Sequence, residues 1–79
     1  ANLCHAYLVR AKLADADLCF ARCDWANLSR ANLQGAKLEG TSLRGTNLVG
    51  SNLQGAYLAG INWAMTTLDK TQFDDPALF

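Results

Sequence analysis

Leucine and small residues recur along the chain with a period of five. The chain has thirteen leucines, and all of them fall in one phase, from Leu3 to Leu78. Only Cys23, Trp63 and Phe73 replace leucine at this central position. Two residues earlier stands a small residue, nearly always Ala, Ser or Thr. A repeat this short and this regular is typical of a solenoid.

A period of five excludes the ordinary secondary structures. In a helix, five residues would carry the leucine stripe round by about 140° at each step, so no apolar face forms. In a flat strand, successive leucines would alternate faces because five is odd. A short extended piece followed by a turn of constant sense instead points the central and the small residue inward. The sequence therefore predicts a narrow core with one large and one small side chain per unit.

The units follow the pattern A(D/N)LXX, which four of them match outright: Ala1-Asn2-Leu3, Ala16-Asp17-Leu18, Ala26-Asn27-Leu28 and Ala31-Asn32-Leu33. On these residues the chain resembles the pentapeptide repeat family, and the resemblance covers essentially all 79 residues. It implies an all-β fold, a right-handed quadrilateral parallel β-helix with four pentapeptides and twenty residues per coil. Residues 1–79 would then form a single domain of about four coils, a rod about 19 Å long.

With twenty residues per coil, each residue is stacked along the coil axis against the residue twenty positions later in the chain. The bulky inward residues then fall in the last coil, so we expect regular coils over 1–60 and a C-terminal coil and cap region over 61–79. The Asp74-Asp75-Pro76 step should end the regular coil. We also expect a partner or another copy to shield the N-terminal face of the first coil. The candidate residues for an end cap or a dimer contact are Trp63, Met65, Phe73 and Phe79.

All six glycines occupy the fifth place of consecutive units, from Gly35 to Gly60. Glycine reaches positive φ without steric cost, so type II corners are expected there. Other residues fill the fifth place in the first third of the chain, for example His5, Arg10 and Trp25. For these corners the residue types predict negative φ and a different turn.

Composition limits the classes of partner. Seven Lys and Arg balance seven Asp and Glu, and 51% of the residues are hydrophobic. The zero net charge excludes a strongly basic nucleic-acid binder, and no apolar run reaches the length of about 18 residues that a membrane helix needs. We therefore expect no nucleic-acid and no membrane partner.

Three cysteines and one histidine invite a metal site, but their spacing matches no zinc pattern. The stacking register points Cys23 inward and Cys4 and Cys19 outward, so the three cannot converge on one ion or form a disulfide with Cys23. We expect no metal and no cofactor. Three unpaired thiols favour a reducing compartment, and hence a cytoplasmic location.

The charged side chains point to a solvated surface. The carboxylates of Asp15, Asp17, Asp24 and Glu39 face outward, and no Ser, Cys and His are placed to form a triad. The register predicts ion pairs between coils, Asp24 with Arg44 and Asp17 with Lys37. We therefore expect the protein not to be an enzyme.

Exposed aromatic residues are the remaining candidates for function, because such side chains often anchor a partner. The candidate interaction surface consists of Phe20, Trp25, His5, Tyr7 and Tyr57. We expect a non-catalytic structural or protein-interaction module, built as a rigid rod. It would bind an unknown protein partner or form a homodimer by end-to-end association, or it would be the repeat portion of a larger protein. The family resemblance implies an alternative, a DNA-mimicking modulator of DNA gyrase or topoisomerase, which the zero net charge disfavours.

Overall fold

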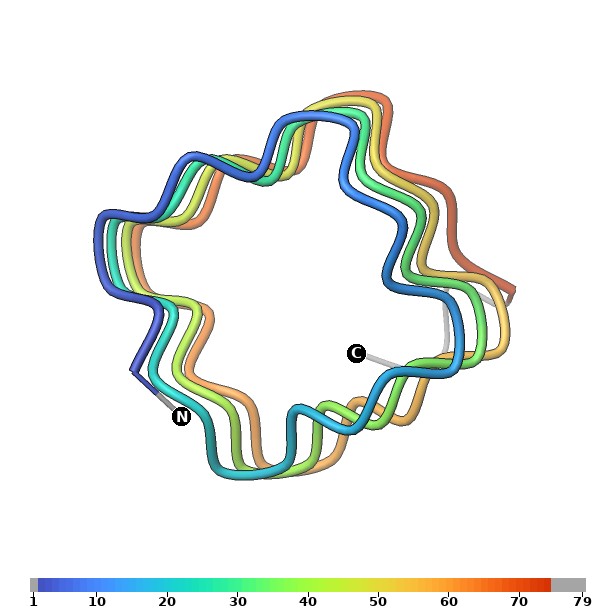
Figure 1. Ribbon diagram of the computed structural model, residues 1–79, viewed down its shortest axis with the longest axis horizontal. Coiled ribbons are helices and arrows are strands. Elements are labelled where there is room, and N and C mark those ends of the chain that lie inside the picture. Colours follow the sequence, from blue (N-terminus) through green and yellow to red (C-terminus); the bar gives the residue numbers. More distant parts are fainter. Residues whose placement is uncertain (1, 75–79) are drawn as a thin grey trace.

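The computed structural model describes residues 2–74, which wind as a right-handed coil with four sides (Figure 1). Each side is one pentapeptide. The second residue of each unit forms an isolated parallel bridge with the residue twenty positions later, from Asn2↔Arg22 to Asn52↔Gln72. Residues 2–74 contain no longer strand and no helix, and thus no helix that could cross a membrane. The predicted quadrilateral parallel β-helix is confirmed.

Nearly every backbone N–H of a unit finds a partner between or within the coils. In the unit beginning at Ala6, the N–H groups of Leu8 and Arg10 donate to the carbonyls of Asn27 and Ser29, at 2.8 and 2.9 Å. In the reverse direction, Asn27 N–H donates to Ala6 at 2.9 Å. The N–H of Ala11 closes the corner on the Leu8 carbonyl at 3.0 Å. Between residues 23 and 57, only the N–H of the fourth residue of each unit is left over.

Asparagine and aspartate at the second place of a unit supply that missing partner. The Asn27 side-chain oxygen accepts the N–H of Ser29 at 3.1 Å, an Asx turn. Seven units of residues 2–74 have this bond, from the side chains of Asn2, Asp17, Asn27, Asn32, Asn47, Asn52 and Asn62. The A(D/N)LXX pattern therefore has a local cause, which the sequence analysis did not identify.

All corners turn with positive φ. The six glycines have φ between 68° and 73°, as predicted. The corners without glycine also have positive φ, for example 62° at Trp25 and 58° at Arg30, so the prediction of negative φ there was wrong. The ladder of hydrogen bonds requires the same backbone in every coil. It outweighs the cost of roughly 1 kcal/mol that a side chain incurs in this region.

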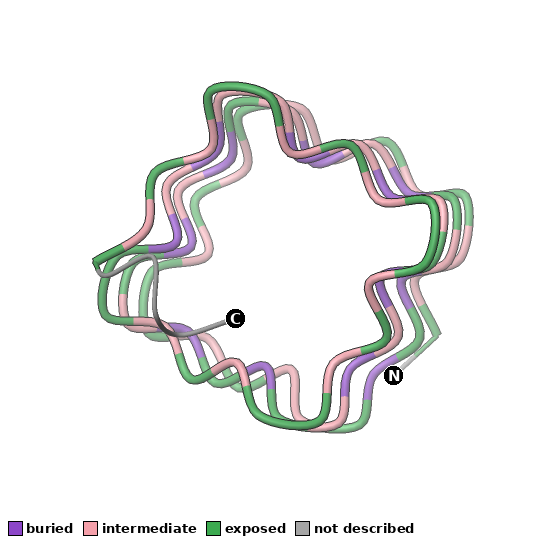
Figure 2. Ribbon diagram, turned by 180° about the vertical axis from the view of Figure 1, so that it is seen from behind, coloured by how far each residue is buried: buried purple, intermediate pink, exposed green. Residues whose placement is uncertain are grey.

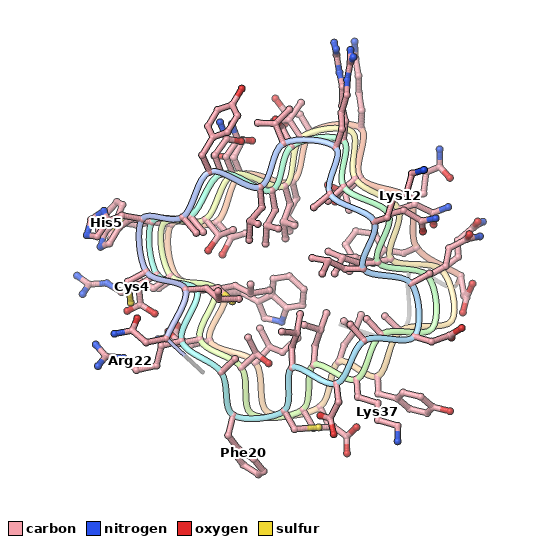
Figure 3. The ribbon with its side chains drawn as sticks, in the orientation of Figure 1. Cys4, His5, Lys12, Phe20, Arg22 and Lys37 are labelled. Carbon is pink, nitrogen blue, oxygen red and sulfur yellow. The ribbon has the colours of Figure 1, made fainter. Side chains whose placement is uncertain are left out.

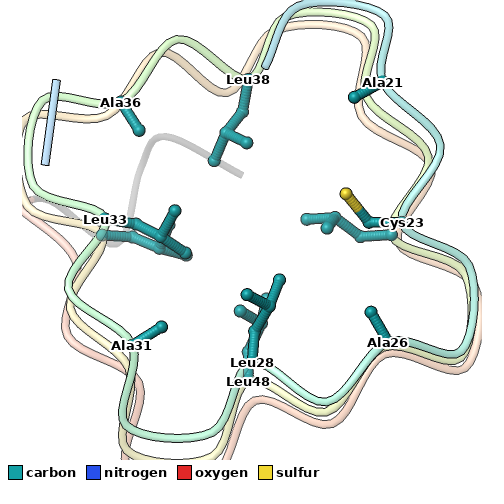
Figure 4. Packing of buried hydrophobic residues seen from close by; sticks show 11 residues of the cluster. Ala21, Cys23, Ala26, Leu28, Ala31, Leu33, Ala36, Leu38 and Leu48 are labelled. Carbon is teal, nitrogen blue, oxygen red and sulfur yellow. The ribbon is translucent and has the colours of Figure 1, made fainter. Parts of the chain in front are cut away.

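The buried core lies in the middle coils. Figure 2 shows the buried positions along the coil, and Figure 4 shows their side chains pointing into the ring. Leu28, Leu48 and Cys23 are buried, whereas Leu8 in the first coil and Leu68 in the last are half-buried. The core is one side chain deep from each wall, as the pattern predicted.

The last described coil carries the bulky inward residues. Trp63 and Phe73 are half-buried against the core, and their rings meet edge to face with centroids 6.4 Å apart. The regular pattern continues past residue 60, since Gln72 still bridges to Asn52. The Asp74 carboxylate then accepts the N–H of Gly55 at 2.6 Å, in place of a backbone carbonyl. The other expected cap elements, Asp75, Pro76 and Phe79, lie outside the described residues.

The overall shape is a block. Its principal extents are 28 × 23 × 21 Å, and the view down the shortest axis looks along the coil (Figure 1). The axial extent agrees with the predicted length of about 19 Å. The coil is wider than it is long, however, so the term rod does not describe this shape.

Threonine at the first place of a unit brings a hydroxyl into the core and satisfies it there. Thr46 Oγ1 donates to the Cys23 carbonyl at 2.7 Å, one coil earlier. The hydroxyls of Thr41, Thr66 and Thr71 make the equivalent bond. Ser51 is the contrast, because its Oγ is buried without a hydrogen-bond partner.

We expect Thr46→Ala and Ser51→Ala to differ in stability although both replace a buried hydroxyl. Thr46→Ala loses a hydrogen bond and a methyl group and should cost about 1–2 kcal/mol. Ser51→Ala removes an unsatisfied group and should be neutral or stabilising. Urea unfolding followed by circular dichroism measures both. An equal loss for the two variants would contradict the assignment of the threonine bond.

Candidate functional site

Two large exposed aromatic residues stand at consecutive corners and border one side of the coil. Phe20 is 79% exposed and Trp25 is 47% exposed. We call the side between them the Trp25 wall, residues 2–5, 21–25, 41–45 and 61–65. Arg22 and Arg44 are exposed on it. Figure 3 shows the side chains of Phe20, Arg22 and His5 pointing outward along this side.

The two corner rings lie on glycines of the next coil. A Cβ added to Gly45 would overlap the ring of Trp25, and one added to Gly40 would overlap the ring of Phe20. Each ring thus occupies the space that a side chain on the next coil would take. The pairing follows from the register of twenty, and combining that register with the glycine positions could have found it from sequence.

Arg44 completes the Trp25 corner. Its guanidinium carbon lies 5.8 Å from the centroid of the Trp25 ring, within the range of a cation–π contact. The predicted ion pair between Asp24 and Arg44 was wrong: the structure, which describes both residues, has no such pair. Oδ1 of Asp24 is instead buried without a hydrogen-bond partner. The Trp25 ring and the Asp24 carboxylate could both bind the Arg44 guanidinium, and in the structure it contacts the ring.

The other predicted interaction residues spread around this wall. His5 lies one coil before Trp25 at the same corner. Tyr7, 78% exposed, lies on the next side beyond that corner. Tyr57, 56% exposed, bridges to Lys37 on the side before Phe20. Three of the five candidates therefore border the Trp25 wall, and the two tyrosines lie on its neighbours.

Met65, predicted as an end-cap or dimer residue, takes a corner position. It stands twenty residues after Gly45 with φ of 58°, and its side chain is 60% exposed. The corner directs it outward at the edge of the Trp25 wall. Trp63 and Phe73, in contrast, lie among the inward columns.

The three cysteines are free thiols in different settings. Burial raises the pKa of the Cys23 thiol to about 11, with smaller effects of Cys4 and Asp24. Desolvation also raises the pKa of Cys19, helped by a hydrogen bond to Asp17. The described residues include no group of three His, Cys, Asp or Glu that could hold a metal ion. Raised pKa values make Cys19 and Cys23 poor nucleophiles.

The repeat geometry lowers the pKa of one surface carboxylate, Asp17. Its pKa is lowered, first by the N–H of Cys19, which donates to Oδ1 at 3.1 Å. Lys37, its bridge partner in the next coil, lowers this pKa further through its charge. The Asx turn is therefore the main stabiliser of the Asp17 carboxylate. The predicted ion pair between Asp17 and Lys37 was wrong: the structure, which describes both residues, has no such pair, and Lys37 acts only through its charge.

The sequence profile described as "Pentapeptide repeats" matches residues 1–35 and 26–62, with eight copies of the repeat. The chain belongs to the pentapeptide repeat family. No curated protein matches the chain.

Solved pentapeptide repeat structures share the fold. Rfr23 from the cyanobacterium Cyanothece 51142 is 39% identical over 94% of this chain, with a TM-score of 0.92. A protein from the thylakoid lumen of Arabidopsis thaliana is 28% identical over 76% of this chain, with a TM-score of 0.74. This chain spans 50% of the first protein and 41% of the second.

We expect Gly45→Ala to destabilise this pentapeptide repeat protein more than Gly60→Ala. Both glycines have φ near 70°, so both variants incur the cost of a side chain at positive φ. At Gly60 the new methyl would make only ordinary contacts, 3.6 Å from the N atom of Gly40. At Gly45 it must displace the Trp25 ring, which should cost about 1 kcal/mol more.

Tryptophan fluorescence and urea unfolding measure the two glycine variants. The emission of Gly45→Ala should shift to longer wavelength as Trp25 enters water, whereas that of Gly60→Ala should not change. Equal stability and equal spectra for the two would contradict the seating of Trp25 on Gly45.

The raised pKa of Cys23 predicts a specific alkaline sensitivity. Because the folded state favours the neutral thiol, this group contributes its full stability below its unfolded pKa of 9.0 and loses it as pH rises to about 11. The stability advantage of the wild type over Cys23→Ala should therefore decline between about pH 9 and 11. Unfolding titrations at several pH values measure it, and an advantage that stays constant would contradict the burial of this thiol.

Proposed function

We propose that this pentapeptide repeat protein is a non-catalytic interaction module whose Trp25 wall binds a partner protein. The observation that carries the proposal is the composition of that wall. Two exposed aromatic residues, Phe20 and Trp25, stand at its edges, with Arg22 and Arg44 between them. Trp and Arg are among the residues that most often dominate the binding energy of protein interfaces.

The wall is rigid before any partner binds, which favours affinity. The backbone under its aromatic corners is fixed by hydrogen bonds to the next coil, Trp25 N–H to Arg44 at 2.8 Å and Phe20 N–H to Glu39 at 2.9 Å. The rings themselves rest on Gly45 and Gly40. Little side-chain entropy remains to be lost on binding at these two residues.

A non-catalytic role is supported by the filled interior. Inward leucines from the four sides meet across the ring, and the described residues enclose no pocket. The carboxylates of Asp15, Asp17 and Glu39 are exposed on the outer surface and line no cavity. Enzymes commonly need a concave site with convergent groups. We therefore propose no catalytic activity and no cofactor.

The balanced charge of the chain supports a protein partner over mimicry of DNA. A mimic of DNA needs a dense row of negative charge, whereas this chain balances seven basic against seven acidic residues. We therefore propose an ordinary protein surface as the partner in preference to the DNA-binding surface of a topoisomerase.

The free thiols of Cys4, Cys19 and Cys23 favour a reducing compartment, and we propose the cytoplasm.

An affinity pull-down from extracts of the source cells tests this proposal. The baits are wild type, a Phe20→Ala/Trp25→Ala variant and a Tyr57→Ala control. Proteins retained by wild type and by the control should be lost with the double variant, because only it removes the aromatic edges of the wall. The same proteins on all three baits would contradict the proposal.

Light scattering behind a sizing column decides whether the partner is a second copy. A dimer that the Phe20→Ala/Trp25→Ala variant disrupts would identify the Trp25 wall as a self-association surface. A monomer at every concentration leaves a different protein as the partner. A dimer that the variant leaves intact would place self-association elsewhere on the coil.

A further inference from the structure

The neutral chain gathers positive charge at one corner. Arg10, Arg30 and Lys70 occupy the fifth place of successive coils at the corner that Gly50 completes. Lys12 is exposed just beyond this corner, on the following side. We call these four basic residues and Gly50 the Arg30 corner. The Arg30 corner holds four of the seven Lys and Arg residues of the chain. Figure 3 shows a stack of nitrogen-tipped side chains at the corner next to Lys12.

Of the basic residues of the Arg30 corner, only Lys70 has an acidic neighbour in the chain. All four are exposed, and within residues 2–74 none of them forms an ion pair. The fourth places that precede this corner carry Val9, Ser29 and Val49, and Asp69 only beside Lys70. Arg10 and Arg30 are adjacent in the stack, where like charges destabilise the pair.

The backbone of this corner is also held in a costly conformation. Arg10, Arg30 and Lys70 have φ of 62°, 58° and 60°, a region that glycine enters without strain and that is unfavourable for other residues. Glycine fills six corner positions of residues 2–74, including position 50 of this corner, so the repeat tolerates glycine there. At Gly50 it leaves room for the stem of Arg30, whose Cγ lies 3.3 Å from the position of an added Cβ. The stem of Arg30 thus lies beside Gly50.

We propose that the Arg30 corner binds a ligand carrying two or more linked phosphate or sulfate groups. Guanidinium groups bind such oxyanions through paired, charge-assisted hydrogen bonds. Arg10 and Arg30 are one coil apart, about 4.8 Å, so neighbouring anionic groups of one ligand can each meet a guanidinium. Bound anions also remove the repulsion within the stack. This site is separate from the Trp25 wall and does not depend on the function proposed for it.

Isothermal titration calorimetry with inorganic tripolyphosphate tests the proposal, with orthophosphate as the single-group comparison. Wild type should bind tripolyphosphate more tightly than orthophosphate. The Arg10→Gly/Arg30→Gly variant should bind it at least about tenfold more weakly, since two guanidinium contacts are lost. Glycine suits the positive φ of both positions, so this variant keeps the fold, which its circular dichroism and unfolding midpoint verify.

Arg22→Gln/Arg44→Gln is the matched control, because it removes the same two charges from the Trp25 wall. It should bind tripolyphosphate within about twofold of wild type. Equal weakening of the two double variants would show a response to overall charge and overturn the proposal. Absence of tripolyphosphate binding by wild type would overturn it as well. Neither result bears on partner capture by the Trp25 wall, which is measured separately.

Discussion

The backbone ladder between coils, fixed at a register of twenty residues, is the constraint on which the rest of this structure depends. Each unit gives and accepts hydrogen bonds with the unit one coil away, as Leu8 and Asn27 do. Because the bonds recur at every step, the backbone must repeat its conformation at every corner. This explains why Trp25 and Arg30 adopt the same positive φ as the glycines. A single strained corner costs less than a break in the ladder, which would expose several unpaired N–H and C=O groups.

The same ladder leaves a narrow interior with strict requirements. From residue 21 to residue 60 every inward place is filled by a leucine or by a small residue. The hydroxyl of an inward threonine such as Thr46 donates to a carbonyl one coil earlier. A core of this kind has no room for a cavity or a buried charged cluster. The outer walls and corners are therefore where binding chemistry can develop, and residues there are varied at little cost to the core.

Stacking also decides which surface residues act together. Residues twenty apart become neighbours, so Trp25 contacts Gly45, and Arg10 and Arg30 share one corner in adjacent coils, although each pair is distant along the chain. A chain with zero net charge can in this way present a basic corner and an aromatic wall on different sides. Net charge describes the average of such a surface and says little about any one corner.

The period of five in the sequence was sufficient to identify the inward residues and the glycine corners, because burial selects the same residue types at each inward place. The four-sided coil was implied by the resemblance to the pentapeptide repeat family. The register of twenty, which the same resemblance implies, then predicted the outward aromatic candidates around the Trp25 wall. The φ of the other corners, the Asx turns of Asn27 and its equivalents, and the choice of Arg44 between Asp24 and Trp25 were decided by the tertiary structure. Each of these depends on hydrogen bonds or on competition between side chains across coils, which residue type and spacing do not report.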